Sequence, residues 1–477
     1  MNTITVDVAV IGAGTAGLAA YRAAKSHGGT VMLIEGGPYG TTCARVGCMP
    51  SKLLIAAADA VHAMGVAPQF GVHPGAVRID GKQVMARVHA ERDRFVGFVL
   101  DGVEKIPSAD RVRGHARFLD AQQLQVDDHT LIRAARIIIA TGSSPQIPDT
   151  MASLGDRLVV NDDVFAWHDL PESVAVIGTG VIGLELGQAL HRLGVRVALF
   201  GRGDNIAQLS DPSVREVAER HLATELDLRL KSTILSTTRD GEAVVVVSKS
   251  RDGTERTERF AYVLAATGRR PNLPQLNVQK TGIELDQRGI PVFDSHTMQC
   301  GRSTIFIAGD VNAEHPILHE AADQGRIAGD NAGRYPDTQV GLRHSPLGVA
   351  FTDPQIATVG QGWRQLAPDS FATGVVSFED QGRSRVMLQN HGVLHVYGDY
   401  GSGRFLGAEM FGPRAEHLAH LLAWAHQNQM TVAQMLRMPF YHPVIEEGLR
   451  TALRDLNEKL LQRVSMLEHC ADCTPGM

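Results

Sequence analysis

The stretch Gly12-Ala13-Gly14-Thr15-Ala16-Gly17 decides the fold of this 477-residue chain. It follows an apolar run rich in Val and Ile, Thr3–Ile11, and it precedes an Ala- and Leu-rich segment with helical character. A second apolar run, Val31–Ile34, leads directly into Glu35. The order strand, glycine turn, helix and strand is the βαβ start of a doubly wound parallel sheet.

The same pattern returns about 165 residues later in the chain. The run Ser173–Ile177 leads into Gly178-Thr179-Gly180-Val181-Ile182-Gly183, a Leu- and Ala-rich segment and the run Val195–Phe200. One glycine-rich turn is a weak signal, but two in this context predict two dinucleotide-binding domains, because glycines let a pyrophosphate approach a helix N-terminus. The predicted contacts are Gly12, Gly14 and Gly17 for one nucleotide and Gly178, Gly180 and Gly183 for the other.

Two further phrases look alike and predict equivalent last strands of the two nucleotide folds. They are IIIATG, which ends in Thr141-Gly142, and VLAATG, which ends in Gly268. Prolines follow both and mark boundaries. The sequence therefore predicts an α/β fold with two Rossmann-like domains and a C-terminal α+β domain. The expected divisions are residues 1–148 (first nucleotide domain), 149–271 (second nucleotide domain), 272–344 (a segment completing the first) and 345–477 (C-terminal domain).

Composition excludes several classes of protein. A hydrophobic share of 44% and a charged share of 21% are typical of a globular chain. The 46 basic and 52 acidic residues give a net charge of −6, so no nucleic-acid footprint is expected. Five cysteines cannot form a disulfide scaffold. The sequence predicts no apolar run of membrane-spanning length and no signal peptide. We therefore expect a cytoplasmic protein without a membrane partner.

The residues after the second strand of each nucleotide fold bear on the choice of nucleotide. Glu35, 18 residues past Gly17, suits the ribose hydroxyls of an adenosine. At the same spacing from Gly183 the chain has Gly201, followed by Arg202. A guanidinium in place of a carboxylate suits a 2′-phosphate, so NADPH is favoured over NADH, although Arg202 at a strand end is also explained by solvation alone.

Two cysteines five positions apart, Cys43 and Cys48, follow the first ribose acid. A helical segment, Leu53–Met64, comes next, and a helix N-terminus favours a thiolate. A zinc site lacks a second ligand pair at the required spacing, and two inert core thiols would be a coincidence. The pattern predicts a redox-active dithiol.

With these motifs the chain resembles the dimeric FAD-dependent pyridine nucleotide–disulfide oxidoreductases. The resemblance covers nearly the whole chain and rests on the phrases GAGTAG, TTCARVGCMPSK, GTGVIGLE, ATGRRPN, IFIAGD and YHPVIEE. The Pro-Ser-Lys after Cys48 is similar to both dihydrolipoamide dehydrogenase and mercuric reductase. His442 stands where mercuric reductases typically have Tyr, so dihydrolipoamide dehydrogenase is the better match. Thr41 and Arg45 depart from the usual Gly and Asn around the first cysteine.

The resemblance implies a role for each residue of the redox centre. Cys48 would lie against the flavin as the charge-transfer thiolate, and Cys43 would exchange with the sulfurs of the substrate. His442 would take the proton of the substrate thiol, held by Glu447, and would come from the partner subunit of a homodimer. Histidine suits this task because it titrates near neutral pH. Without the resemblance, a His-Pro pair is an ordinary turn.

The resemblance also implies cofactor contacts. Lys52 and Glu185 would lie near the flavin ring and Asp310 at its ribityl chain, although each is also an ordinary charged or turn residue when taken alone. The remaining implied contacts with FAD or NAD(P) are Thr42, Ala116, Thr141, Gly142 and Gly268. No resident metal is expected.

The leading expectation is oxidation of a dithiol, coupled to NAD(P) through FAD. The resemblance favours dihydrolipoamide as this dithiol, either free or as the lipoyl group of a multienzyme complex. A second interpretation is an NADPH-dependent reductase of another disulfide, a quinone or a metal ion. A third is an inactive cofactor-bearing scaffold subunit, which the intact Cys43, Cys48, His442 and Glu447 argue against.

Three cysteines lie outside the motif. Cys300 has no partner in the sequence and is predicted to be structural. Apolar spacing after Leu449 predicts a helix to about Leu467. Cys470 and Cys473 stand beyond it, either without a role or as an exchanging pair that relays electrons to a bulky or metal acceptor.

Overall fold

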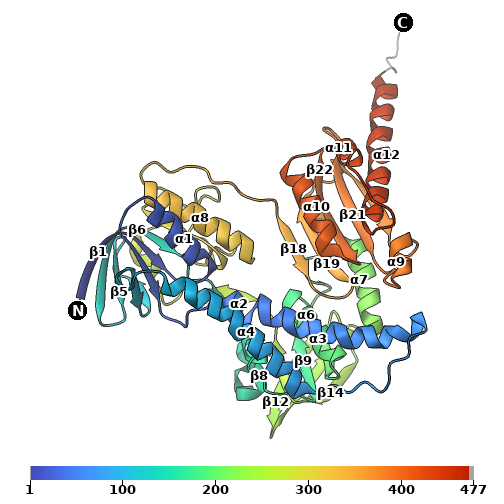
Figure 1. Ribbon diagram of the computed structural model, residues 1–477, viewed down its shortest axis with the longest axis horizontal. Coiled ribbons are helices and arrows are strands. Elements are labelled where there is room, and N and C mark those ends of the chain that lie inside the picture. The colour runs from blue at the N-terminus through green and yellow to red at the C-terminus, as the bar shows by residue number, and fades with distance from the viewer. Residues whose placement is uncertain (1, 472–477) are drawn as a thin grey trace.

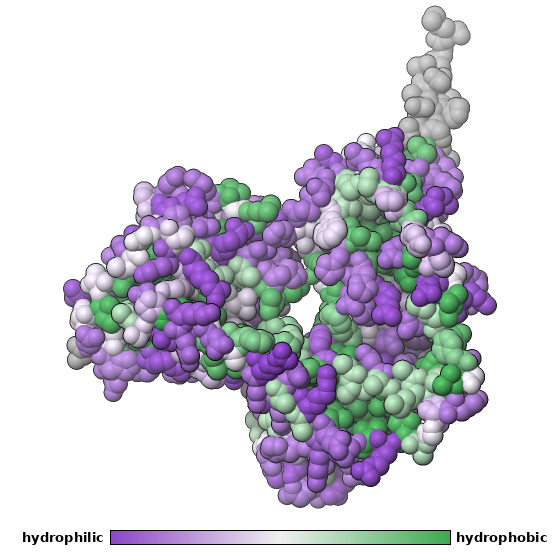
Figure 2. All heavy atoms as spheres, viewed as in Figure 1, coloured by the Kyte–Doolittle hydropathy of each residue, from purple (hydrophilic) through white to green (hydrophobic). Residues whose placement is uncertain are grey.

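The computed structural model describes residues 2–471, with side chains described to residue 462, and its three lobes surround an open gap (Figures 1 and 2). The first lobe is built on a parallel sheet in which β1 (Asn2–Ile11) lies between β2 (Val31–Glu35) and β6 (Thr130–Ile139). A strand from much later in the chain, β17 (Ile305–Ile307), pairs with β6. The sheet is completed by β3 (Arg111–Arg113), parallel to β2, and by two antiparallel pairings, of β5 (Gln123–Val126) with β6 and of β4 (Ala116–Phe118) with β5.

Two helices pack closely against each other on one side of this sheet, α1 (Thr15–Ser26) and α8 (Leu318–Arg334) (Figure 1). Two glycines of α8 allow the approach. A Cβ atom on Gly325 would lie 2.2 Å from the carbonyl oxygen of Ala16, and one on Gly329 would lie 2.3 Å from that of Ala20. The segment that follows the second lobe in sequence is thus packed into the first.

The second lobe repeats the pattern with β9 (Ser173–Ile177) between β10 (Arg196–Phe200) and β15 (Tyr262–Ala265), all parallel. The short strands β11 (Asp227–Arg229) and β8 (Leu158–Val159) form its edges. Its helices are α5 (Asn161–Val164), α6 (Val181–Arg192) and α7 (Pro212–Glu225), and its antiparallel sheet is β12 (Thr233–Asp240), β13 (Ala243–Lys249) and β14 (Glu255–Phe260). A two-stranded ribbon, β7 (Ser143–Pro145) with β16 (Arg269–Pro271), joins the two lobes.

The third lobe is an antiparallel sheet with helices against it. Its order is β18 (Leu347–Ala350), β19 (Gln355–Gly360), β22 (Phe405–Gly412), β21 (Val393–Asp399) and β20 (Phe371–Ser377). Its helices are α9 (Gly382–Val386), α10 (Ala415–Gln427), α11 (Val432–Leu436) and α12 (Glu446–Ala471). The predicted α/β architecture, two doubly wound sheets followed by an α+β unit, is confirmed.

The last helix extends beyond the predicted end. It continues through Ala471, and the expectation that it stops at about Leu467 was wrong. The apolar pattern ends there, but no helix-breaking residue occurs before Pro475. Cys470 is therefore part of the helix, whereas Cys473 lies outside the described residues, so the relay remains a prediction.

A pair of long helices, α3 (Cys48–Val66) and α4 (Gly81–Glu104), connects the first two lobes, and α3 packs on α6 (Figure 1). Among the described residues, one helical stretch, Thr42–Phe70, has the length and the apolar composition that a membrane span needs. Of its most apolar 18-residue segment, 11% is buried. The expectation that no stretch reaches this length was wrong, because alanines raise the hydropathy of α3. The helix also carries Lys52 and Asp59 and packs against two others.

Candidate functional site

The two cysteines lie on successive helices. Cys43 is in α2 (Thr42–Val46), and Cys48 is the first residue of α3, with Gly47 between the two helices. The helix therefore begins five residues before the predicted Leu53, which places the second thiol directly at a helix N-terminus. The thiols are not bridged, and they share a hydrogen bond. The two cysteines are thus in contact, and their redox activity stays a prediction.

The surroundings shift the pKa values of the two thiols in opposite directions. The hydrogen bond with Cys43 lowers the pKa of Cys48, burial opposes this, and the positive charge of Lys52 lowers it further, to about 7. The same hydrogen bond and burial raise the pKa of Cys43 well above its ordinary value. In the reduced centre, the proton therefore stays on Cys43 and the negative charge resides on Cys48.

Lys52 is held by a carboxylate of the second lobe. Its Nζ lies 2.7 Å from Oε2 of Glu185, which is 4% exposed. Glu185 is on α6, so this ion pair joins α3 of the first lobe to the second lobe. The two residues, 133 positions apart in sequence, lie together as the resemblance implies.

The two departures around Cys43 have a visible structural consequence. Thr41 has φ of 59°, a region that L residues with a Cβ rarely adopt and that glycine adopts freely. Its hydroxyl caps α2 by accepting a hydrogen bond from the N–H of Ala44 at 3.3 Å. The side chain of Arg45 lies against Gly40, and a Cβ added at Gly40 would lie 3.0 Å from Cδ of Arg45. The cap offsets part of the cost of the strained backbone.

The first glycine turn has the shape of a pyrophosphate cradle. A Cβ on Gly12 would lie 2.3 Å from the carbonyl oxygen of Ala140, and one on Gly17 would lie 1.8 Å from that of Gly12, so only glycine fits. Gly14 instead faces open space at the start of α1. The Glu35 carboxylate is fixed beside the turn by the N–H groups of Ala13 and Gly37, each at 2.7 Å. These residues fit an adenosine diphosphate moiety.

Two further implied contacts of the first lobe are Ala116 and Asp310. Ala116 lies on β4, two residues after Gly114, whose N–H bonds the carbonyl oxygen of Glu35 at 3.0 Å. Asp310 follows β17 and accepts a hydrogen bond from Ser143 at 2.9 Å. The Arg269 guanidinium donates to the side-chain oxygen of Ser143 at 2.9 Å and to the carbonyl oxygen of Ser143 at 2.7 Å. Sequence reasoning gave no role to Ser143 or Arg269, although Arg269 lies within the phrase ATGRRPN.

Thr141, Gly142 and Gly268 lie where the ribbon joins the two lobes. The Thr141 hydroxyl donates to the carbonyl oxygen of Asn272 at 2.9 Å, and the N–H of Asn272 donates to that of Gly142 at 3.0 Å. Gly142 and Gly268 have φ of +68° and +112°, which explains why the two similar phrases end in glycine. Thr42 is the exposed first residue of α2.

The second glycine turn reproduces the first. A Cβ on Gly178 would lie 2.2 Å from the carbonyl oxygen of Ala266, one on Gly183 would lie 2.0 Å from that of Gly178, and Gly180 is open. Arg202 is exposed beyond the end of β10, and none of the ion pairs of the described residues includes it. Its guanidinium is thus available to a ligand at this end of the sheet.

His442 lies between α11 and α12 and pairs with Glu447, the second residue of α12. The imidazole Nδ1 lies 2.9 Å from Oε1 of Glu447, whose other oxygen accepts the N–H of Val444 at 3.2 Å. The hydrogen bond with His442 lowers the pKa of Glu447. The His442 side chain is 79% exposed, which leaves Nε2 free to meet a substrate or another chain.

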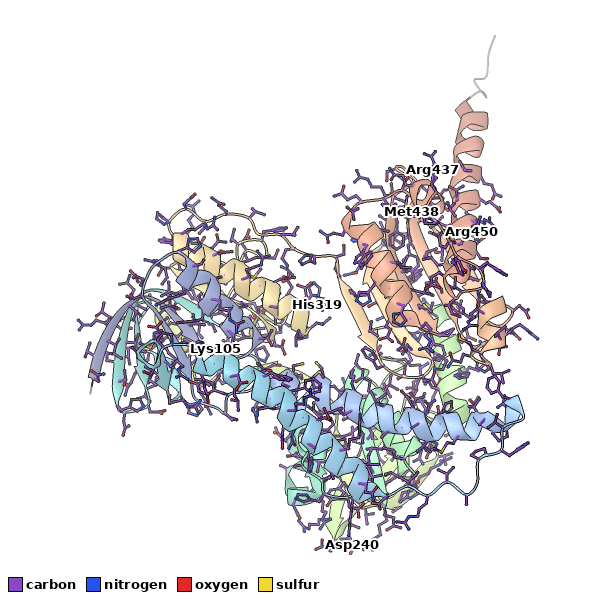
Figure 3. The ribbon with its side chains drawn as sticks, viewed as in Figure 1. Lys105, Asp240, His319, Arg437, Met438 and Arg450 are labelled. Atoms are coloured by element: carbon purple, nitrogen blue, oxygen red, sulfur yellow. The ribbon has the colours of Figure 1, made fainter. Side chains whose placement is uncertain are left out.

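The pair belongs to a different lobe from the cysteines of its own chain. Arg437, Met438 and Arg450 flank it in sequence and lie in the third lobe, and α2 lies across the gap from that lobe (Figures 1 and 3). Within residues 2–462, no hydrogen bond or ion pair joins His442 to Cys43 or Cys48. A single chain thus does not bring together the four predicted catalytic residues.

Cys300 is buried, at 1% exposure, in the apolar core of the first lobe, and burial raises the pKa of its thiol to about 12. These surroundings suit an inert structural thiol. In the part of the chain that the structure describes, no group of three or more His, Cys, Asp or Glu side chains is arranged to hold a metal ion.

Comparisons with known proteins agree on the family. Residues 6–325 match the family described as pyridine nucleotide-disulphide oxidoreductase, and residues 347–453 match its dimerisation domain. Among curated relatives, mercuric reductase of Shigella flexneri is 30% identical over 96% of this chain and 82% of its own length. Dihydrolipoyl dehydrogenase of Halobacterium salinarum is 31% identical over 94% of this chain and 95% of its own.

Solved structures share the fold. LpdA from Mycobacterium tuberculosis superposes with a TM-score of 0.79 at 25% identity and covers 95% of this chain and 99% of its own. The HOCl-induced flavoprotein disulfide reductase RclA from Escherichia coli gives the same TM-score at 21% identity over 95% of this chain and 99% of its own. The second likeness bears on the fold alone.

The family and its dimerisation domain support a homodimer and an oxidoreductase with a disulfide redox centre. The predicted cofactors, FAD and NAD(P), are those of the family. With two glycine cradles, a polarised dithiol and matches over nearly its whole length, the chain belongs to the pyridine nucleotide-disulphide oxidoreductases.

Proposed function

We propose that this protein is a dihydrolipoamide dehydrogenase-type enzyme that oxidises a small dithiol to a disulfide and delivers the electrons to NAD(P). The observation that carries the proposal is the opposite polarisation of the two thiols, since their hydrogen bond and burial keep the proton on Cys43, while the same hydrogen bond and Lys52 favour the anion of Cys48. Bound FAD supplies the two-electron path between this dithiol and the nicotinamide. The Halobacterium salinarum dihydrolipoyl dehydrogenase, 31% identical, supports the choice of substrate class.

The polarisation assigns a direction to thiol exchange. The first substrate sulfur attacks Sγ of Cys43 in the Cys43–Cys48 disulfide and forms a mixed disulfide. Cys48 leaves because the thiol with the lower pKa is the better leaving group, and Lys52 stabilises the resulting thiolate. The second substrate sulfur then attacks the first, which releases the oxidised substrate and Cys43.

The protons balance through the histidine. The partner subunit's His442 takes a proton from the substrate thiol at Nε2, while Glu447 holds Nδ1 and stabilises the imidazolium. The substrate loses two electrons and two protons. One proton ends on Cys43 and the other passes through the imidazole to solvent, while Cys48 remains a thiolate.

A second candidate is an NADPH-dependent reductase of a metal ion, a quinone or another disulfide. Arg202 at the end of β10 favours NADPH, and several relatives, including that of Shigella flexneri, are named mercuric reductase. In this case the reduced dithiol would be the electron donor to the acceptor.

A steady-state comparison of the purified FAD-loaded protein tests the two candidates. Dihydrolipoamide with NAD⁺ or NADP⁺ is compared with lipoamide, glutathione disulfide, a quinone and Hg(II), each with NADH or NADPH. The proposal requires kcat/KM for the lipoamide couple to exceed that for every other acceptor. A higher value for Hg(II) or a quinone would replace it with the second candidate.

A further inference from the structure

The ammonium group of Lys52 is one of the points where residues of all three lobes meet. Lys52 comes from α3, Glu185 comes from α6 of the second lobe, and Phe351 follows β18 of the third. The Nζ atom lies 2.7 Å from the Glu185 carboxylate and 4.5 Å from the centroid of the Phe351 ring. The sequence pattern gave no role to Phe351.

Phe351 touches both members of the ion pair. Its backbone N–H donates to Oε1 of Glu185 at 2.9 Å, while Lys52 binds the other carboxylate oxygen. Phe351 therefore binds the Glu185 carboxylate through its main chain and the Lys52 ammonium through the face of its ring. The face of an aromatic ring attracts an ammonium group.

The segment that carries Phe351 is anchored on the same helix by a second set of bonds. The N–H of Asp353 donates to Oε1 of Gln188 at 2.8 Å, and Nε2 of Gln188 donates back to the carbonyl oxygen of Asp353 at 2.8 Å. Thr352, between them, is 2% exposed and its hydroxyl donates to the carbonyl oxygen of Pro354. The ring is thus held in register with Lys52 by the packing of the third lobe against α6.

We infer that Phe351 is a positioning residue for the dithiol. The packing of the third lobe against α6 places the Phe351 ring on Lys52, and this contact sets how strongly Lys52 stabilises the Cys48 thiolate. The inference rests on the proposed role of Cys48. Both contacts act in the same direction. The ring holds the cation at the position from which it lowers the pKa of Cys48, and the N–H bond partly neutralises the Glu185 carboxylate, which raises that pKa.

The charges around Cys48 are consistent with this link. Lys52 lowers the pKa of Cys48 and Glu185 raises it, so the position of the pair decides the balance. Phe351→Leu removes the aromatic face but keeps an apolar side chain and the backbone N–H. Lys52 then loses its attraction to the ring, and the thiolate loses part of its stabilisation.

The test is a pH titration of the FAD-loaded protein carrying Cys43→Ser, followed by the long-wavelength absorbance of the Cys48 thiolate against the flavin. With Phe351→Leu added, the midpoint should rise by about half a unit to one unit of pH. Phe351→Tyr retains the ring and should restore the parent midpoint. Trp363→Leu, at an exposed aromatic of the same lobe, is the matched control and should not shift it.

A double-mutant cycle with Lys52→Met shows whether the effect passes through the cation. In the Lys52→Met background, Phe351→Leu should produce no further shift. A shift that persists there, or an unchanged midpoint in Phe351→Leu alone, overturns the inference while leaving the proposed function intact. If Phe351→Leu does not fold, Phe351→Met replaces it. A Cys43→Ser parent without the absorbance band would overturn the role of Cys48 and this inference together.

Discussion

The Nδ1 atom of His442 lies 2.9 Å from Oε1 and 3.1 Å from Oε2 of Glu447. The carboxylate is held in place by the N–H of Val444, and the imidazole is otherwise exposed. The pair therefore presents Nε2 outward from the third lobe, with its other nitrogen already bonded to an anion. This is the arrangement of a general base that will meet its thiol on another surface.

Glu447→Gln keeps the size of the side chain but removes the charge that stabilises the protonated imidazole. We expect kcat for dithiol oxidation to fall by about ten- to a hundredfold, a part of the effect of a complete general base. The measurement is steady-state turnover with dihydrolipoamide, and Glu446→Gln, the neighbouring acid, is the control. Equal losses in both variants would show that the charge of Glu447 has no specific role.

Cys43→Ser removes the exchanging thiol and leaves Cys48. Turnover of every disulfide should be lost, whereas the long-wavelength absorbance of a Cys48 thiolate beside FAD should remain. Lys52 still lowers the pKa of Cys48, and the serine hydroxyl can donate the hydrogen bond that the Cys43 thiol gave, so the absorbance should grow as pH rises and disappear in acid, where the thiol is protonated. Retained turnover would contradict the assignment of the two cysteines.

The sequence was sufficient for the parts of the fold and site that depend on local pattern. The strand Ser173–Ile177 is found with the predicted bounds, because β-branched residues followed by a glycine turn leave little choice. Glu185 could be placed near Lys52 only through the resemblance. Their ion pair spans 133 positions, and no periodicity encodes a contact of that range.

Residues that act through the packing of lobes were not predictable from one sequence. Phe351 reads as an ordinary apolar residue after a strand, and its contact with Lys52 arises only when the third lobe packs on α6. The start of α3 at Cys48 was also missed, because the Gly47-Cys48 junction carries no capping side chain. The placement of α2, which carries Cys43, apart from the third lobe, which carries His442, depends on the arrangement of the lobes (Figure 1).

Arg202→Ala tests the choice of nicotinamide nucleotide. A charge-assisted bond to the 2′-phosphate contributes about 1.5–3 kcal/mol, so kcat/KM with NADPH should fall about ten- to a hundredfold relative to that with NADH. Arg251→Ala, at an exposed arginine of the same lobe, is the control and should change neither. Equal losses with both nucleotides after Arg202→Ala would show that Arg202 does not contact the phosphate.

Mixing two inactive variants tests whether the site is shared between subunits. Cys43→Ser lacks the exchanging thiol and His442→Ala lacks the base, and each homodimer should be inactive. In a heterodimer, one site combines both defects, while the other combines an intact Cys43 with the intact His442 of the partner subunit. Random exchange at equal concentrations makes half of the dimers mixed, so about a quarter of the wild-type activity should return.

Subunit exchange has to be verified independently, by differently tagged chains and native mass spectrometry. If the catalytic pair acted on the cysteines of its own chain, every subunit of the mixed dimer would carry one defect. No activity would then return despite verified exchange, and the shared site would be refuted. The separation of α2, which carries Cys43, from the third lobe, which carries the segment between α11 and α12, is the reason to expect recovery (Figure 1).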